Sequence, residues 1–143
     1  MFAIDIDGWL HPSRHCPSPN FNERPPGSVI ELLVIHNISL PPGQFGGGHV
    51  AELFTNCLDG CAHPAFTELA DLKVSAHLLI ERDGAVTQFV PFGARAWHAG
   101  VSVFEERTNC NDFSVGIELE GLEGDAFEPD QYATLSALCA AIA

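Results

Sequence analysis

The stretch Glu31–Pro42, ELLVIHNISLPP, runs through four consecutive apolar residues into a histidine and an asparagine, and closes on two prolines. Residues 29–36 form a nearly continuous β-rich run, which is typical of a central strand covered on both faces. A side chain at the end of such a strand is held rigidly and faces the loops where sites are built. His36 is therefore a candidate functional residue, although a hydrogen-bonded histidine at the rim of the core fits the sequence equally well.

Two segments show the periodicity of amphipathic helices. Residues 50–58 carry apolar side chains at positions i, i+3, i+4, i+7 and i+8. Residues 127–143 begin with an acidic residue and a proline, and then place Tyr132, Leu135, Leu138, Cys139 and Ile142 on one stripe. This last helix has no glycine, basic turn or polar tail to satisfy its final carbonyls. We therefore expect a domain that is incomplete at its C-terminal end.

Two further segments predict strands. Residues 74–81 and 85–92 flank Asp83-Gly84, a pair that supplies the positive φ angles of a tight hairpin turn. Residues 113–121 alternate between apolar and polar side chains, as a strand does. Helices and strands in this order predict an α/β domain with a mixed central sheet flanked by helices.

The chain is short enough for one domain. Its 143 residues suffice for a single core. Residues 1–28 are rich in proline, serine and asparagine, which predicts an irregular N-terminal wrap anchored by Trp9 and Leu10. The domain itself is expected to span residues 29–143.

Composition limits the partners and the location. Six basic and 19 acidic side chains give a net charge of -13, which repels nucleic-acid phosphates and anionic lipid headgroups. The N-terminus lacks the basic residues of a signal peptide, and no segment approaches the roughly 20 apolar residues of a membrane span. Five irregularly spaced cysteines predict reduced, buried thiols. We expect a cytoplasmic monomer with no nucleic-acid or membrane partner.

Seven histidines raise the question of a metal site. Neutral imidazole is the commonest zinc ligand, and a catalytic zinc needs three protein ligands, so His36, His77 and His98 form one candidate triad. The local group of Cys57, Cys61 and His63 lacks the second ligand pair of a structural zinc site. Packing thiols beside a surface histidine are the more natural interpretation of that group.

Glu118 and Glu120 form a second constellation. They lie two residues apart on one strand face, so their α-carbons are roughly 6.5–7 Å apart. One of them is a candidate general base with a pKa raised by burial. Alternation on a half-buried strand leaves open that both point into water. A glycosidase, which uses two carboxylates across a sugar bond, also stays open.

Five motifs, in the same order and spacing, resemble those of the zinc N-acetylmuramoyl-L-alanine amidases. The motifs are VIHNISLPPGQFGG, CAHPAF, LKVSAHLLIERDG, QFVPFGARAWHAGVS and CNDFSVGIELEG, and the resemblance covers nearly the whole chain. This family includes the cytoplasmic 1,6-anhydro-N-acetylmuramyl-L-alanine amidases of peptidoglycan recycling and the peptidoglycan recognition proteins. The resemblance implies their fold and zinc-dependent cleavage of the bond between (anhydro-)N-acetylmuramic acid and L-alanine.

The resemblance also assigns individual residues. It implies that His36 ligates zinc and that Glu118 is the catalytic acid/base. Asn37, Lys73 and Trp97 match positions that contact the ligand, Trp97 near the sugar and Lys73 near the peptide carboxylate. His77 and His98 do not match zinc ligands, which leaves them supporting or packing roles.

Three departures from the family pattern matter. Ala65 stands where relatives have an important tyrosine, and Asn109 stands where they have an arginine. The family takes its second zinc histidine, a catalytic lysine and an aspartate ligand from a segment that would follow the last helix. The alternative to the amidase is therefore a non-catalytic muropeptide-binding fragment without a complete zinc site.

Overall fold

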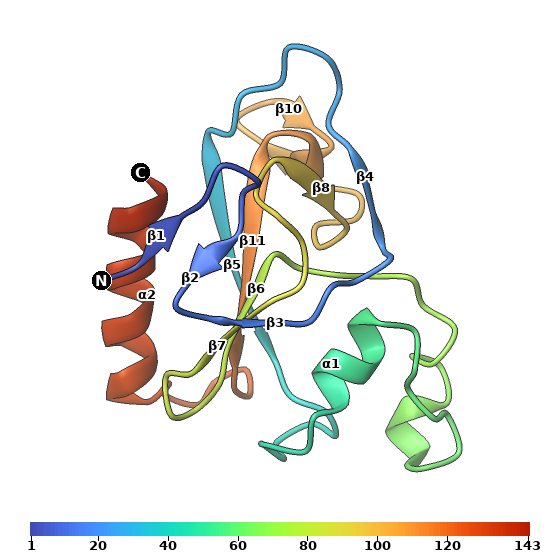
Figure 1. Ribbon diagram of the computed structural model, residues 1–143. Helices are drawn as coiled ribbons and strands as arrows, with labels where there is room; N and C mark the ends of the chain where they lie inside the picture. Colours follow the sequence, from blue (N-terminus) through green and yellow to red (C-terminus); the bar gives the residue numbers. More distant parts are fainter.

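A five-stranded mixed sheet forms the centre of the computed structural model, which describes residues 1–143 (Figure 1). Its strand order is β3-β7-β6-β11-β5. In chain order the strands are β3 (Arg14–His15), β5 (Leu32–Ile38), β6 (Leu78–Ile80), β7 (Val86–Gln88) and β11 (Ser114–Glu120). β11 pairs in parallel with both β5 and β6, whereas β6 and β7 form an antiparallel hairpin. The predicted mixed sheet and its hairpin are confirmed.

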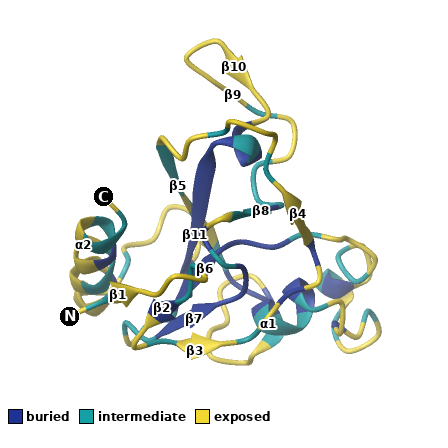
Figure 2. Cartoon of the chain, turned by 45° about the horizontal axis from the view of Figure 1, so that its top comes forward, coloured by how far each residue is buried: buried dark blue, intermediate teal, exposed yellow.

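β11 lies inside the sheet between β6 and β5, and its two faces have different surroundings. The prediction that residues 29–36 form a central strand is wrong, because β5 lies at the edge of the sheet and none of its residues is fully buried. Val115, Ile117 and Leu119 point toward α2 (Pro129–Ile142), which covers one side of the sheet (Figure 1). The other face carries Glu118, whose partner in the register with β5 is His36. Figure 2 shows β11 buried along its whole length.

The core has two parts. Against α2, the buried apolar residues are Leu10, Leu78, Ile80, Val86, Phe92, Val115, Ile117, Leu119 and Leu138. On the opposite side of the sheet, α1 (His49–Phe54) packs with Leu79 and Phe89 into a second cluster that reaches the 3-10 helix η1 (Pro64–Phe66). The predicted layering of helices around the sheet is therefore confirmed.

Residues 1–28 are more regular than the sequence suggested. They form β1 (Ala3–Ile4), β2 (Leu10–His11), β3 and β4 (Phe21–Glu23). β3 joins the main sheet beside β7, and β4 pairs with β8 (Ala94–Ala96). Leu10 is fully buried as expected, and Trp9 is half-buried. Residues 1–28 are thus part of the domain, because β3 and β4 pair with its other strands.

A second short ladder projects from the domain. β9 (Val103–Phe104) and β10 (Arg107–Thr108) form an exposed hairpin (Figure 2), which η2 (Cys110–Asp112) connects to β11. Arg107 lies over the ring of Phe113, 3.8 Å from its centroid, and pairs with Glu31 at 2.5 Å. These contacts fasten the hairpin to the beginning of β11 and β5.

Several sequence expectations need correction. α1 ends at Phe54 instead of residue 58, because Asn56 adopts a left-handed φ of 61° that a helix cannot continue. All five cysteines are free, but only Cys110 is buried, and Cys57 and Cys61 are exposed instead of packed. Tyr132 is exposed as well, so it is not part of the buried stripe of α2. None of the helices has the length and apolar character that crossing a bilayer requires.

A buried amide docks the first turn of α2 onto the sheet. The side chain of Gln131, which has no exposed surface, donates through Nε2 to the backbone carbonyls of Ile80 (3.2 Å) and Glu120 (2.9 Å). Its Oε1 accepts the backbone N–H of Glu128 at 2.9 Å within a capping box. One side chain therefore joins the ends of β6 and β11 to the start of the helix.

Replacing Gln131 by leucine should lower the free energy of unfolding by about 1–3 kcal/mol, because two buried carbonyls and one helix N–H each lose a hydrogen bond while the volume is kept. Urea denaturation followed by circular dichroism measures this. Ser136→Ala on the exposed face of the same helix is the control, with an expected change within about 0.5 kcal/mol. Equal stability of the two variants would contradict the docking role.

Candidate active site

A pocket of about 340 Å³ opens on the face of the sheet that carries Glu118. Ile38 and Glu118 form its floor, α1 contributes Leu53 and Phe54, and the loop from Trp97 to Gly100 forms another wall. The remaining lining residues are Lys73, Val74, Ser75, His98 and Asn111. Segments far apart in the sequence thus enclose one carboxyl group.

Glu118 is the most strongly perturbed acid in the structure. Its side chain is 9% exposed, and its Oε2 is buried without any hydrogen-bond partner. Burial raises the pKa of this carboxyl to about 8, because the charged form loses its hydration and gains no donor. A carboxyl that titrates near neutrality is suited to take up and release a proton. The alternative that Glu118 points into water is therefore wrong.

Glu120 is also buried, but its surroundings differ. Its carboxylate accepts the backbone N–H of Gly46 at 2.6 Å and that of Arg82 at 3.2 Å. It therefore ties the glycine-rich loop before α1 to the hairpin turn between β6 and β7. Since Glu120 is satisfied and does not line the pocket, the two glutamates are not a matched catalytic pair.

His36 is held by a chain of hydrogen bonds. Its Nε2 lies 2.9 Å from Nδ1 of His98, whose Nε2 lies 3.0 Å from the hydroxyl of Ser114. The His98 ring crosses the strand directly over Gly116, where an added Cβ would lie 2.4 Å from Cγ of His98. Burial lowers the pKa of both imidazoles, that of His98 to about 3. The glycine is thus the reason that His98 can reach His36.

His77 has a packing role. Its Nδ1 accepts the backbone N–H of Gly116 at 3.1 Å, so the ring proton sits on Nε2, which donates to the carbonyl of Ala94 at 3.0 Å. Burial lowers the pKa of this fully enclosed imidazole to about 4. Both nitrogens are engaged, which leaves no lone pair for a metal and agrees with the expectation that His77 is not a ligand.

The predicted substrate contacts are brought together only in part. Lys73 and Trp97 both line the pocket, and the indole Nε1 donates to Oδ1 of Asn22 at 3.0 Å. Asn37 is exposed and pairs with Leu119, so strand alternation directs its side chain to the face opposite His36. Its contact with substrate stays a prediction. Neither Ala65 nor Asn109 lines the pocket.

Sequence reasoning missed Ser75 and Asn111, which line the pocket and hold its wall. The hydroxyl of Ser75 accepts the backbone N–H of Trp97 at 3.1 Å and donates to the carbonyl of Asn20 at 2.6 Å. The side-chain oxygen of Asn111 accepts two backbone N–H groups of the same loop. Neither residue type nor spacing identifies these residues as part of a pocket, because their hydrogen-bond partners come from other segments of the chain.

The residues of this chain do not by themselves fit a catalytic zinc ion. Such an ion takes three protein ligands and keeps one open position. No group of three or more histidine, cysteine, aspartate or glutamate side chains converges to hold a metal. The short contact between His36 and His98 is a hydrogen bond, and Glu118 is a protonatable carboxyl on the neighbouring strand. His36 stands as a single predicted ligand.

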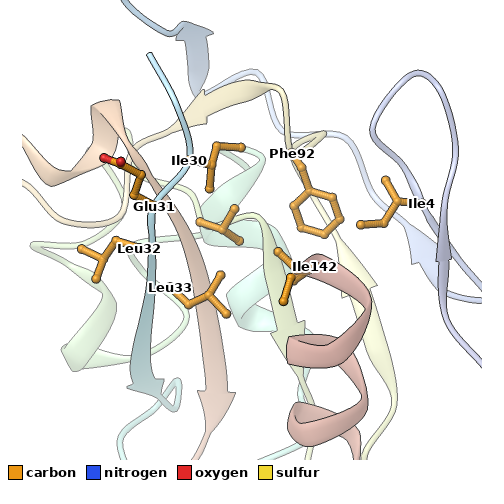
Figure 3. Close-up of a pocket in the computed structure, with 9 residues that line it drawn as sticks. Ile4, Ile30, Glu31, Leu32, Leu33, Phe92 and Ile142 are labelled. Carbon is orange, nitrogen blue, oxygen red and sulfur yellow. The ribbon is translucent and has the colours of Figure 1, made fainter.

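A second pocket of about 340 Å³ lies away from these groups. It is lined almost entirely by apolar side chains, among them Ile4, Ile30, Leu33, Phe92 and Ile142 (Figure 3). Glu31 is its only ionisable side chain, and that group pairs with Arg107. Apart from Glu31, the pocket offers only apolar contact and no acid, base or nucleophile.

The fold is that of a known enzyme family. Residues 26–143 match the N-acetylmuramoyl-L-alanine amidase family, and the chain belongs to it. The chain is 54% identical over 135 residues to the 1,6-anhydro-N-acetylmuramyl-L-alanine amidase AmpD of Escherichia coli K12, a match that covers 94% of this chain and 74% of that protein.

Solved structures agree with this family assignment. The crystal structure of a selenomethionine derivative of AmpD matches with a TM-score of 0.94 and 52% identity, covering 97% of this chain and 77% of that one. The E. coli amidase AmiD, in complex with anhydro-N-acetylmuramic acid-L-Ala-D-γ-Glu-L-Lys, matches with a TM-score of 0.52 and 25% identity, over 97% of this chain and 50% of that one. The predicted family and fold class are confirmed.

The burial of Glu118 predicts a pH-dependent stability. Because its folded pKa of about 8 lies above the ordinary 4.5, its contribution is complete below about pH 4.5 and is lost as the pH rises to about 8. In chelator-treated protein, the stability of the wild type relative to Glu118→Gln should fall by roughly 3–5 kcal/mol between pH 4.5 and 8. Urea titrations at several pH values measure this difference. A constant difference would mean that the carboxyl ionises as it does in water.

Gly116→Ala should displace the His98 ring and break its contacts with Ser114 and His36. We expect a loss of about 1–3 kcal/mol in stability, as for other over-packed cores, and altered ring chemical shifts of His36. Gly93→Ala is the matched control, since an added Cβ there meets nothing within 4 Å. Unchanged His36 resonances in Gly116→Ala would refute the proposed crowding.

Proposed function

We propose that this protein hydrolyses the amide bond between N-acetylmuramic acid, including its 1,6-anhydro form, and the L-alanine of peptidoglycan fragments in cell-wall recycling. The observation that carries this proposal is the unpartnered carboxyl of Glu118 in the floor of the pocket, with a pKa of about 8 and with His36 opposite it in the register. The match to AmpD of E. coli supports the choice of substrate.

Glu118 is the proposed acid/base of this reaction. Amide hydrolysis requires a proton to leave the attacking water and a proton to reach the departing amine. A carboxyl with a pKa near the working pH performs both transfers, whereas an ordinary carboxylate is too weak a base. The enclosed pocket keeps this group out of bulk water and so preserves the raised pKa.

Zinc is the proposed cofactor, with His36 as one ligand. Zinc dependence is a property of the family to which the chain belongs. No three histidine, cysteine, aspartate or glutamate side chains of residues 1–143 converge on a metal, so the metal is given no chemical step. The second candidate function is the binding of muropeptides without hydrolysis, through the pocket lined by Lys73 and Trp97.

Substrate recognition is assigned to the pocket walls. Lys73 is the cation of the pocket and suits a peptide carboxylate, while the indole of Trp97 suits stacking on the sugar. Asn37 is retained as a third proposed contact. We further propose a small-molecule substrate, a monomer and a cytoplasmic location, the last because all five cysteines are free.

Incubation with an anhydromuramyl peptide and zinc separates the two functions: a protein whose zinc site is complete should release the L-alanyl peptide, and a binding protein should not. Chromatography with mass spectrometry detects the peptide. Glu118→Gln should reduce the rate by about 10²–10⁴-fold, because both proton transfers lose their carrier. Glu123→Gln, which removes the same charge from an exposed position, should retain the wild-type rate.

Other outcomes separate the alternatives. Affinity that survives a chelator, with no peptide released in excess zinc, would support the binding function. Release of a reducing sugar in place of peptide would indicate a glycosidase. Absence of both affinity and cleavage would overturn the assignment.

A further inference from the structure

Asn111 presents an oriented amide group to the pocket. Its side chain is 5% exposed and lines the pocket together with Glu118 and Trp97. Its Oδ1 accepts the backbone N–H of His98 at 3.1 Å and that of Ala99 at 2.9 Å. Since two donors point at one atom, that atom has to be the amide oxygen, which fixes the orientation of the side chain.

The amide nitrogen of Asn111 is consequently left without a partner in the chain. Three other amide side chains are buried, namely Asn20, Gln88 and Gln131, and each donates its nitrogen to at least two acceptors. Nδ2 of Asn111 makes no hydrogen bond within the chain, and it is not among the fully enclosed polar atoms that lack a partner. Since Asn111 lines the pocket, this donor is reachable from the pocket and is free to bond an acceptor that comes from outside the chain.

We propose that Asn111 binds the substrate, with Nδ2 donating a hydrogen bond to a carbonyl oxygen of the muropeptide. This inference rests on the proposed function of the same pocket. A neutral N–H donor suits a neutral carbonyl, whereas the carboxylates of the peptide have a cationic partner in Lys73. Asn111 then has two roles: its oxygen positions the loop that carries Trp97, and its nitrogen contacts the ligand.

Asn111→Asp separates these two roles. The aspartate keeps an oxygen for the backbone N–H groups of His98 and Ala99, and it removes both N–H donors. Calorimetry with an anhydromuramyl tripeptide, in the presence of a chelator, should show about tenfold weaker binding than the wild type. Hydrogen exchange at His98 and Ala99 should stay slow in Asn111→Asp and become fast in Asn111→Ala, which loses the anchor as well.

Asn22→Asp is the charge control. It places the same negative charge beside Trp97 and keeps the acceptor for the indole N–H, but removes no donor from the pocket wall. We expect its affinity to fall by less than about threefold, as for a rim charge screened by solvent. If both aspartate variants weaken binding equally, charge repulsion explains the loss and the inference fails.

A measurement on the wild type does not depend on how a variant folds. During a titration with the tripeptide, the side-chain NH₂ resonances of Asn111 should move downfield, as expected for a new hydrogen bond. Binding without such a shift, or with full affinity in Asn111→Asp, would overturn this inference and leave the proposed function standing. A wild type that neither binds nor cleaves the tripeptide would overturn the function itself.

Discussion

The parallel pairing of β11 with β5, in the register that sets Glu118 opposite His36, is the constraint on which the site depends. Strand side chains alternate between faces, so a slip of one residue would turn Glu118 toward α2 and Leu119 into the pocket. The packing of Val115, Ile117 and Leu119 under α2 excludes that slip, because it would bury two carboxyls in an apolar layer. The apolar face of the strand thereby fixes the position of the chemistry on the other face.

Glu118 and Glu120 lie on one face of the same strand but have different hydrogen-bond partners. Glu120 accepts two backbone N–H groups and serves as a structural fastener between two loops. Glu118 is buried to a similar degree, but its Oε2 has no donor. Burial without a donor destabilises the charged form of Glu118 and raises its pKa to about 8. The missing hydrogen bonds thus separate the proposed acid/base from the carboxylate that joins the two loops.

The sequence predicted the strands and turns better than it predicted which side chains are buried around them. Alternation in residues 113–121 and the Asp83-Gly84 turn are local signals, and both elements form as expected. The burial of Glu118 is not local, because α1 and the loop from Trp97 to Gly100 cover it from distant parts of the chain. Gly116 was the one residue whose type indicated that another group packs against this face of the strand. A glycine inside a strand often marks such a close approach, here by the ring of His98.

The positions of Glu118 and His36 in the sheet are consistent with the roles proposed for them. Glu118 lies on β11, an interior strand, where layers on both faces exclude water and raise its pKa to about 8. His36 lies on β5, the edge strand, where its ring is less enclosed and is oriented from one side by His98. A proton carrier needs burial, whereas a metal ligand needs open space for the ion and its other ligands. Adjacent strands, one interior and one at the edge, supply both environments within a single register pair.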